Sequence, residues 1–196
     1  MRKLIVNEWM SFDGVVQAPM LEDEDLSGGF PHGGWHSPYF DDESMGWVVD
    51  SVANAGGYVL GRRTYEAFAG FWPNAPEDQQ MLAQPLNTLP KHVASRSLSG
   101  PLEWENSSVL EGDLVTAVTR LKEQDGADLR VIGSADLTRD LVANDLVDEF
   151  WLMIDPLVLG GGKRFLPDDG VKRALRVKEC RTTATGAILA IYATER

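Results

Sequence analysis

The chain has 196 residues, a formal net charge of -12 and one cysteine, Cys180. We expect a single domain over residues 1–196, and one cysteine excludes an internal disulfide framework. The acidic balance argues against a broad nucleic-acid surface, and no stretch approaches the ~20 apolar residues of a membrane span. These features predict a cytoplasmic protein that acts on a small molecule, with no nucleic-acid and no membrane partner.

Strands and helices are expected to alternate along the chain, because short apolar runs typical of strands alternate with segments whose apolar residues recur at helical spacing. In chain order we expect a strand at 2–10, a long loop at 17–38, a helix from Asp41, a strand at 58–61, a short helix from Thr64, a break at Pro73 and Pro76, a strand at 91–95, a helix with Asp113 as N-cap, a strand at 129–134, a helix at 135–146, a long strand at 147–159 and two strands around Thr185-Gly186. This order predicts an α/β fold with a mixed, mostly parallel central sheet, helices on both faces and an antiparallel C-terminal edge.

Three turns follow predicted strands at the points where ligands bind in such sheets. The first holds Gly61, Arg62, Arg63 and Thr64, the second holds Ser95, Arg96 and Ser97, and the third holds Gly133, Ser134 and Ala135. Each turn alone is typical of ordinary helix capping. Two of them carry arginine, whose planar fork binds two phosphate oxygens at once. Together they predict a site for a pyrophosphate and a second phosphate.

Other motifs fail on spacing. His32 and His36 lie four residues apart, but the glycines between them indicate a loop, and no third metal ligand is evident. The acidic stretch at 21–28 has Gly34 where a calcium loop requires glutamate. The GGGKRF segment at 160–165 lacks the Ser or Thr that follows lysine in a phosphate loop. No metal site is therefore expected.

A set of segments resembles the dihydrofolate-reductase-like family. These segments are SFDG (11–14), VLGRRTYEAF (59–68), HVASRS (92–97), VIGSADLTRDL (131–141) and VDEFWLMIDPLVLGGGKRFL (147–166). The branch they resemble most is the C-terminal reductase domain of the riboflavin-biosynthesis bifunctional deaminase-reductase, together with its stand-alone members. The resemblance covers essentially the whole chain. It implies an NADPH-dependent reductase, usually a homodimer.

The resemblance also implies which residues hold the cofactor. The turn at Gly61, Arg62, Arg63 and Thr64 is expected near the phosphates, the turn at Ser95, Arg96 and Ser97 near the adenosine 2'-phosphate, and Gly133, Ser134, Ala135, Asp136 and Leu137 at the pyrophosphate. Arginine and serine beside a 2'-phosphate favour NADPH over NADH. Asp13 matches a family position near the nicotinamide edge and is the candidate catalytic residue. Its alternative role is that of an Asp-Gly turn residue.

The substrate side is less specific. Candidate substrate-binding residues are Trp35, Tyr39, Phe40 and Asp41. Dihydrofolate reductase has an acid two residues after the matching proline, where this chain has Phe40. Asp41 comes one residue later, which rotates a helical side chain by about 100° and argues against folate reduction. Asp41 also fits the start of a helix, where an acid stabilises the dipole.

These observations predict hydride transfer from NADPH to a small unsaturated substrate of pterin, pyrimidine or carbonyl type. Ordered water or Asp13 is the candidate proton donor. An alternative is a non-catalytic NADPH-binding or regulatory protein on the same scaffold. A third possibility is an interaction protein that docks through the acidic loop at 21–28.

Overall fold

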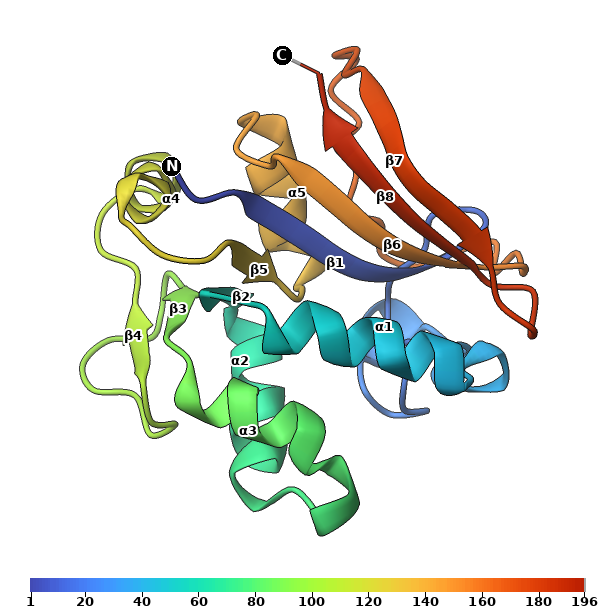
Figure 1. Ribbon diagram of the computed structural model, residues 1–196, viewed down its shortest axis with the longest axis horizontal. Coiled ribbons are helices and arrows are strands. Elements are labelled where there is room, and N and C mark those ends of the chain that lie inside the picture. Colours follow the sequence, from blue (N-terminus) through green and yellow to red (C-terminus); the bar gives the residue numbers. More distant parts are fainter. Residues whose placement is uncertain (196) are drawn as a thin grey trace.

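Eight strands form one sheet in the order β4-β3-β2-β5-β1-β6-β8-β7. The computed structural model describes residues 1–195, and its strands are β1 (Leu4–Ser11), β2 (Gly57–Gly61), β3 (Lys91–Ala94), β4 (Ser107–Val109), β5 (Leu129–Val131), β6 (Glu149–Asp155), β7 (Leu175–Thr182) and β8 (Ile188–Thr194). The first six strands run parallel, whereas β8 is antiparallel to both β6 and β7 (Figure 1). The predicted mostly parallel sheet with an antiparallel C-terminal edge is therefore confirmed.

Helices cover both faces of this sheet, as predicted. On one face lie α1 (Asp42–Ala53), α2 (Arg62–Phe71) and α3 (Gln80–Thr88), and on the other lie α4 (Leu114–Glu123) and α5 (Ala135–Ala143) (Figure 1). Alternation along β2 divides the core between the two layers, because Tyr58 and Leu60 pack toward the first group and Val59 toward the second. The buried apolar residues of both layers hold the carboxyl ends of the parallel strands in a fixed arrangement.

Side-chain caps fix the starts of two helices. The Asp41 carboxylate accepts a hydrogen bond from the Ser44 amide at 2.9 Å and begins α1, and Asp113 accepts one from the Thr116 amide at 2.9 Å and begins α4. The second cap is the one that the sequence predicts for this helix. Each cap satisfies an N–H group that the helix itself leaves unpaired.

Two elements were not expected. Helix α3 starts beyond the prolines that were expected to end regular structure, and it carries Pro85 inside it while burying Ala83 and Leu86. Strand β4 has three residues and lies at the edge of the sheet, where a period of two residues gives almost no signal. In the opposite direction, the long strand expected at 147–159 ends at Asp155, because Pro156 cannot donate to the ladder.

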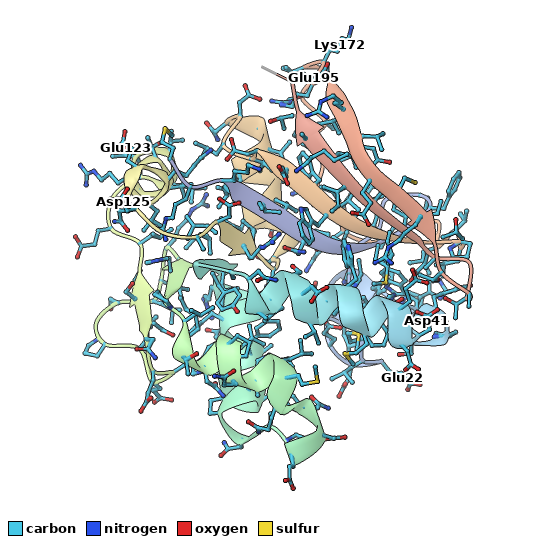
Figure 2. All side chains as sticks on the ribbon, in the orientation of Figure 1. Glu22, Asp41, Glu123, Asp125, Lys172 and Glu195 are labelled. Carbon is cyan, nitrogen blue, oxygen red and sulfur yellow. The ribbon has the colours of Figure 1, made fainter. Side chains whose placement is uncertain are left out.

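Charged side chains dominate the periphery of the molecule. Figure 2 labels Glu22, Asp41, Glu123, Asp125, Lys172 and Glu195, which lie around the rim of the ribbon. None of the helices within residues 1–195 is long and apolar enough to cross a membrane.

The ends of β2 and β5 come into close contact. The Gly61 amide donates to the Gly133 carbonyl at 3.2 Å. A Cβ atom on Gly61 would clash with Ser134 Oγ and would lie 3.0 Å from the Ser134 amide nitrogen. Glycine at position 61 therefore lets the two turns touch through their backbones.

We expect Gly61→Ala to lower the free energy of unfolding by about 1–3 kcal/mol, because the added methyl group must push the Ser134 turn away. Urea denaturation followed by circular dichroism measures this change. The matched control is Gly46→Ala in α1, where nothing lies within 4 Å of the added Cβ. That control should be stabilised by about 0.5–1 kcal/mol, and an equal effect of the two substitutions contradicts the close-contact argument.

Candidate functional site

The three strand-end turns singled out in the sequence meet at one edge of the sheet. Gly61 at the end of β2 pairs in register with Ala94 at the end of β3, and it bonds to Gly133, which follows β5. The Arg62 guanidinium donates to the Ser97 hydroxyl at 2.7 Å and so ties the first turn to the second. These contacts bring the three turns that carry the expected cofactor-binding residues together at one edge of the sheet.

Two helix N-termini open onto this surface. Helix α2 begins after Gly61 and α5 begins after Ser134, and within residues 1–195 no side chain caps either start. Their first N–H groups point beyond the strand ends, where they can donate to an anion. The contact at Gly61 and Ser134 leaves no room for a side chain at position 61, so the two helix starts lie close together. This arrangement fits the pyrophosphate of a dinucleotide.

Of the arginines in these turns, one forms an ion pair and another does not. Arg62 pairs with Glu66 at 2.7 Å, whereas the exposed Arg96 makes no ion pair within the described chain. Ser95 lies beside it and accepts hydrogen bonds from the amides of Ser97 and Leu98. An unpaired cation next to two hydroxyl groups favours an anionic ligand such as a 2'-phosphate.

A cavity of about 520 Å³ extends from the α5 turn toward α1. Its polar wall includes Arg63, Thr64 and the segment from Gly133 to Asp136, so part of the predicted cofactor set lines it. Leu137 lies outside this lining and packs in the core instead. The apolar wall consists of large side chains from four elements and the turns between them, namely Trp9, Trp47, Val48, Phe68, Trp72, Leu82 and Leu86. Such a wall suits a flat ring, because aromatic side chains stack on it.

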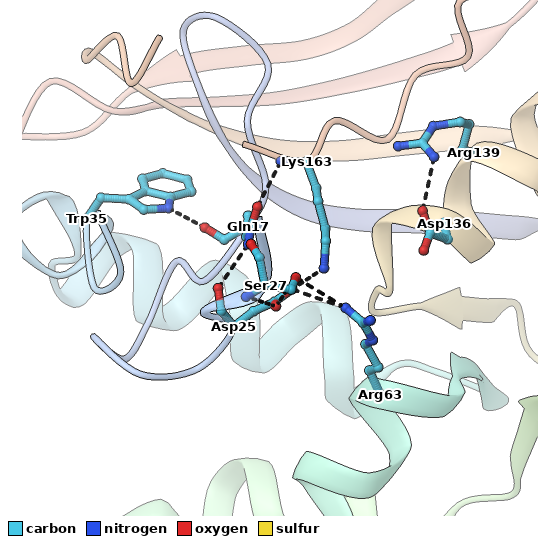
Figure 3. A network of polar contacts seen from close by, with 8 residues as sticks. All are labelled: Gln17, Asp25, Ser27, Trp35, Arg63, Asp136, Arg139 and Lys163. Carbon is cyan, nitrogen blue, oxygen red and sulfur yellow. Dashed lines mark hydrogen bonds and ion pairs between the residues drawn. The ribbon is translucent and has the colours of Figure 1, made fainter. Parts of the chain in front are cut away.

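The loop at 17–38 forms one side of the cavity and is held in place by Gln17. The buried Gln17 amide nitrogen donates to the carbonyls of Asp25 and Ser27, both at 2.9 Å, and its side-chain oxygen accepts from the Lys163 amide at 3.1 Å. Trp35 donates to the Gln17 carbonyl at 2.7 Å (Figure 3). A single buried amide therefore joins the tip of the loop to the segment that carries Lys163.

Two cations converge on this loop at the cavity edge. Lys163 forms an ion pair with Asp25, and Arg63 lies 3.7 Å from the same carboxylate (Figure 3). Burial opposes ionisation of Asp25, but hydrogen bonds from Lys163 and Ser27 outweigh it and lower the pKa of the carboxyl. The charged form of Asp25 therefore connects the loop to Arg63 in α2 and to Lys163 in the segment that follows β6.

Asp13, the candidate catalytic residue, lies outside the cavity lining. Its carboxylate accepts hydrogen bonds from the Ser11 hydroxyl at 2.7 Å and from the amides of Leu159 and Gly160 at 3.1 and 3.0 Å, and it pairs with Arg164 at 3.3 Å. The hydrogen bond from Ser11 and those from the two amides lower its pKa to about 2. These contacts give Asp13 an anchoring role for the glycine-rich segment after β6.

The four candidate substrate-binding residues also lie outside this cavity lining. Trp35 belongs to the loop and is buried among Val15, Ala18 and Phe30. Tyr39 and Phe40 pack against the core group around Trp47, and Asp41 caps α1. The structure thus brings most of the cofactor set together, while the substrate set serves the loop and the start of α1.

Most of the cavity lining was missed in the sequence analysis, including two residues of the first strand. Glu8 and Trp9 lie in β1 and line the cavity, and the Thr138 hydroxyl donates to the Glu8 carboxylate at 3.0 Å. Trp9 stacks on the buried His36 ring at 4.9 Å, and His36 Nδ1 lies 2.7 Å from Asp155. The available signal was the run LIVNEWM, in which two polar residues interrupt an otherwise apolar strand.

Comparison with known protein families decides the identity of the fold. The model of the RibD C-terminal domain matches residues 2–189. This chain belongs to the RibD C-terminal domain family. Membership in this family supports a reductase function in general.

Relatives and solved structures agree with that assignment. The chain is 28% identical to the uncharacterised Bacillus subtilis protein YyaP over 154 residues, which cover 77% of this chain and 80% of that protein. It is 40% identical to the uncharacterised B. subtilis protein YwjB over 123 residues, which cover 63% of this chain and 65% of that protein. Its fold matches a putative riboflavin biosynthesis protein from a Shewanella species with a TM-score of 0.74, 18% identity and 99% coverage of both chains. A pyrimidine reductase-like protein from Corynebacterium diphtheriae matches with a TM-score of 0.64, 14% identity and coverage of 100% and 92%.

We expect Asp13→Asn to destabilise the RibD C-terminal fold by about 1–2 kcal/mol near neutral pH, because the lost charge leaves Arg164 and two amides with a weaker acceptor. The pKa of Asp13 is about 2 in the folded protein, below the ordinary aspartate value of 3.8, so ionised Asp13 stabilises the fold at neutral pH and loses this effect as the pH falls toward 2. The difference in the free energy of unfolding between the variant and the wild type should therefore become smaller as the pH falls below about 4. Urea denaturation across a pH series measures it, and a difference independent of pH contradicts the anchoring role.

Loss of the Asp25 charge should open the loop. Asp25→Asn removes the ion-pair partner of both Lys163 and Arg63. The free energy needed to open the loop should fall by about 1 kcal/mol, so a protease should cleave the loop roughly fivefold faster. Limited digestion with a glutamate-specific protease reports on Glu22 and Glu24 in this loop. Asp23→Asn is the matched control, since Asp23 is exposed and pairs with nothing within residues 1–195. Equal cleavage of the two variants contradicts the role of the ion pairs.

Proposed function

We propose that this protein is an NADPH-dependent reductase that transfers hydride to a small, flat, unsaturated substrate. The observation that carries the proposal is the junction of three strand-end turns. Two of them begin helices with uncapped N-termini beside a cavity with an aromatic wall, and the third carries the unpaired Arg96 outside that cavity. Phosphate groups suit the helix starts, and a conjugated ring suits the aromatic wall. Membership in the RibD C-terminal domain family supports the same cofactor.

The residues of this chain divide the work between binding and orientation. The turns at Gly61 and Gly133 would hold the pyrophosphate, and Ser95, Arg96 and Ser97 would hold the 2'-phosphate. NADPH supplies the hydride. Trp9 and Trp47, which both line the cavity, would orient the substrate ring, and the loop fixed by Gln17 would exclude water from it.

A substrate of pyrimidine or pterin type is proposed on two grounds. The cavity volume of about 520 Å³ accommodates a bicyclic ring system beside a nicotinamide, and its lining combines aromatic surface with carboxyl and amide groups. The structural neighbours are described as a putative riboflavin biosynthesis protein and a pyrimidine reductase-like protein. A carbonyl compound of similar size remains within the proposed class.

Nucleotide binding tests the proposal directly. We expect tryptophan fluorescence to show tighter binding of NADPH than of NADH, because only NADPH carries the 2'-phosphate. Arg96→Ala should weaken NADPH binding about 10–100-fold, since a hydrogen bond to a charged group contributes ~1.5–3 kcal/mol, and should leave NADH binding unchanged. Arg120→Ala is the charge-matched control, because Arg120 is exposed on α4 on the other side of the sheet.

The same titration separates the alternatives. Failure of the wild type to bind either nucleotide contradicts the reductase proposal. Tight NADPH binding is then followed by a turnover assay, in which loss of the reduced-nicotinamide absorbance is monitored with dihydropterin, iminopyrimidine and small carbonyl probes. Binding without turnover of any probe favours the non-catalytic NADPH-binding alternative.

A further inference from the structure

The side chain of Glu8 occupies a distinctive place in the cavity. The register of β1 against β5 pairs Val6 with Val131, and it places Glu8 level with the Gly133 turn. Glu8 lines the cavity beside the start of α5, whereas its neighbour Asn7 bonds to Ser51 of α1. A carboxyl group thus stands where the proposed cofactor turn and the aromatic wall meet.

The surroundings of Glu8 favour its neutral form. Burial raises its pKa to about 8, a hydrogen bond from Thr138 opposes that shift, and the nearby Glu24 carboxylate adds to it. The other charged side chains that line the cavity are Glu24, Asp25, Arg63, Glu66, Asp136 and Lys163. The two cations among them face Asp25, and no cation forms an ion pair with Glu8 within residues 1–195.

A hydrogen-bonded chain connects Glu8 to α5. Thr138 is fully buried, and its hydroxyl lies 3.0 Å from Glu8 Oε1 and 3.2 Å from the Ser134 carbonyl oxygen. When Glu8 is ionised, the hydroxyl donates to the carboxylate. When Glu8 is neutral, the hydroxyl can donate to the Ser134 carbonyl instead, and the carboxyl proton is left for transfer. Both protonation states are therefore satisfied without moving the side chain.

We propose that Glu8 is the general acid of the reduction and delivers a proton to the substrate heteroatom as hydride reaches the adjacent carbon. In this step the nicotinamide C–H bond breaks and a C–H bond forms on a C=N or C=O carbon. The Glu8 O–H bond breaks, an N–H or O–H bond forms, and NADP⁺ and the Glu8 carboxylate remain. Solvent then reprotonates the carboxylate. The inference rests on the proposed function.

The geometry favours Glu8 over the other acids. Asp13 lies outside the cavity lining and its low pKa keeps it ionised near neutral pH. Asp25 is engaged by Lys163, Asp136 by Arg139 at 3.0 Å, and Glu66 by Arg62. Glu24 accepts two backbone hydrogen bonds from its own loop. An acid near its pKa in a low-dielectric site is suited to transfer a proton at neutral pH.

The predicted pH dependence follows from the acid form. The hydride-transfer rate should be constant below the pKa of Glu8 and fall about tenfold per pH unit above it, because only the protonated carboxyl donates. Glu8→Gln should keep the fold and the NADPH affinity, since an amide replaces a neutral carboxyl of the same shape. It should lose about 100-fold or more of the single-turnover rate and lose the pH dependence.

The experiment combines three measurements on wild type, Glu8→Gln and Glu123→Gln. The last is the control, since Glu123 is an exposed acid at the end of α4 (Figure 2). Nuclear magnetic resonance with glutamate labelled at the side-chain carboxyl carbon follows the titration of Glu8 in the NADPH complex, with the signal assigned by its absence in Glu8→Gln. Fluorescence gives the NADPH affinity, and stopped-flow absorbance gives hydride transfer to the probe that the wild type reduces fastest.

The outcomes separate this inference from the proposed function. A Glu8 signal that titrates near 8, with a slow, pH-independent Glu8→Gln variant of normal NADPH affinity, supports the general-acid role. NADPH binding with a Glu8 signal that titrates near the ordinary glutamate value of 4.5 overturns it and leaves the reductase proposal intact. A Glu8→Gln variant as fast as Glu123→Gln also overturns it. Failure of the wild type to bind NADPH removes the proposed function and this role together.

Thr138→Val tests the positioning residue. Removal of the hydroxyl deletes the one hydrogen bond that lowers the pKa of Glu8, so the titration should move to higher pH. The hydride-transfer profile should move by the same amount. An unchanged profile contradicts the connection between Thr138 and Glu8.

Discussion

The close contact between the backbones at Gly61 and Ser134 determines the geometry of the whole site. These residues end or follow neighbouring parallel strands, so their distance fixes how far apart α2 and α5 begin. A side chain at position 61 separates the two turns, whereas glycine lets two sets of unpaired N–H groups face one volume. The cavity, its aromatic wall and the loop above it are arranged around this contact. The constraint is steric, and it is therefore insensitive to salt and pH.

Ion pairs hold the loop at 17–38 against the rest of the site, whereas the arrangement of the sheet depends on packing. The chain carries 30 acidic and 18 basic side chains, so most cations have an acidic neighbour available. Asp25 connects Arg63 and Lys163 across the cavity edge, and Gln17 holds the same loop through neutral hydrogen bonds. Closure of the loop therefore combines a buried amide, which works at any pH, with partly exposed ion pairs, which salt and acid weaken.

The strand-end residues could be predicted from the sequence, because small and cationic residues at the ends of apolar runs carry a local signal. The parallel sheet and its antiparallel edge followed from the same alternation. Helix α3 escaped prediction because the prolines before it and Pro85 within it all argue against a helix, and burial of Leu86 overrides them. The cavity residues of β1 escaped for another reason. Alternation along this eight-residue strand shows which residues share a face. Which face borders a cavity depends on the elements that pack around the strand, and the sequence does not show these.

Asp13 and Glu8 show why residue type alone did not identify the acid. Both belong to the first strand or the turn after it, and both are carboxyl groups close to the carboxyl edge of the sheet. Asp13 accepts hydrogen bonds from Ser11 and two amides and lies beside Arg164, which stabilises its charge, whereas Glu8 meets Thr138 in a cavity whose cations are directed elsewhere. The pKa is about 2 in the first case and about 8 in the second. Environment thus separates an anchoring carboxylate from a proton-donating carboxyl, and this separation depends on contacts between segments distant in the sequence.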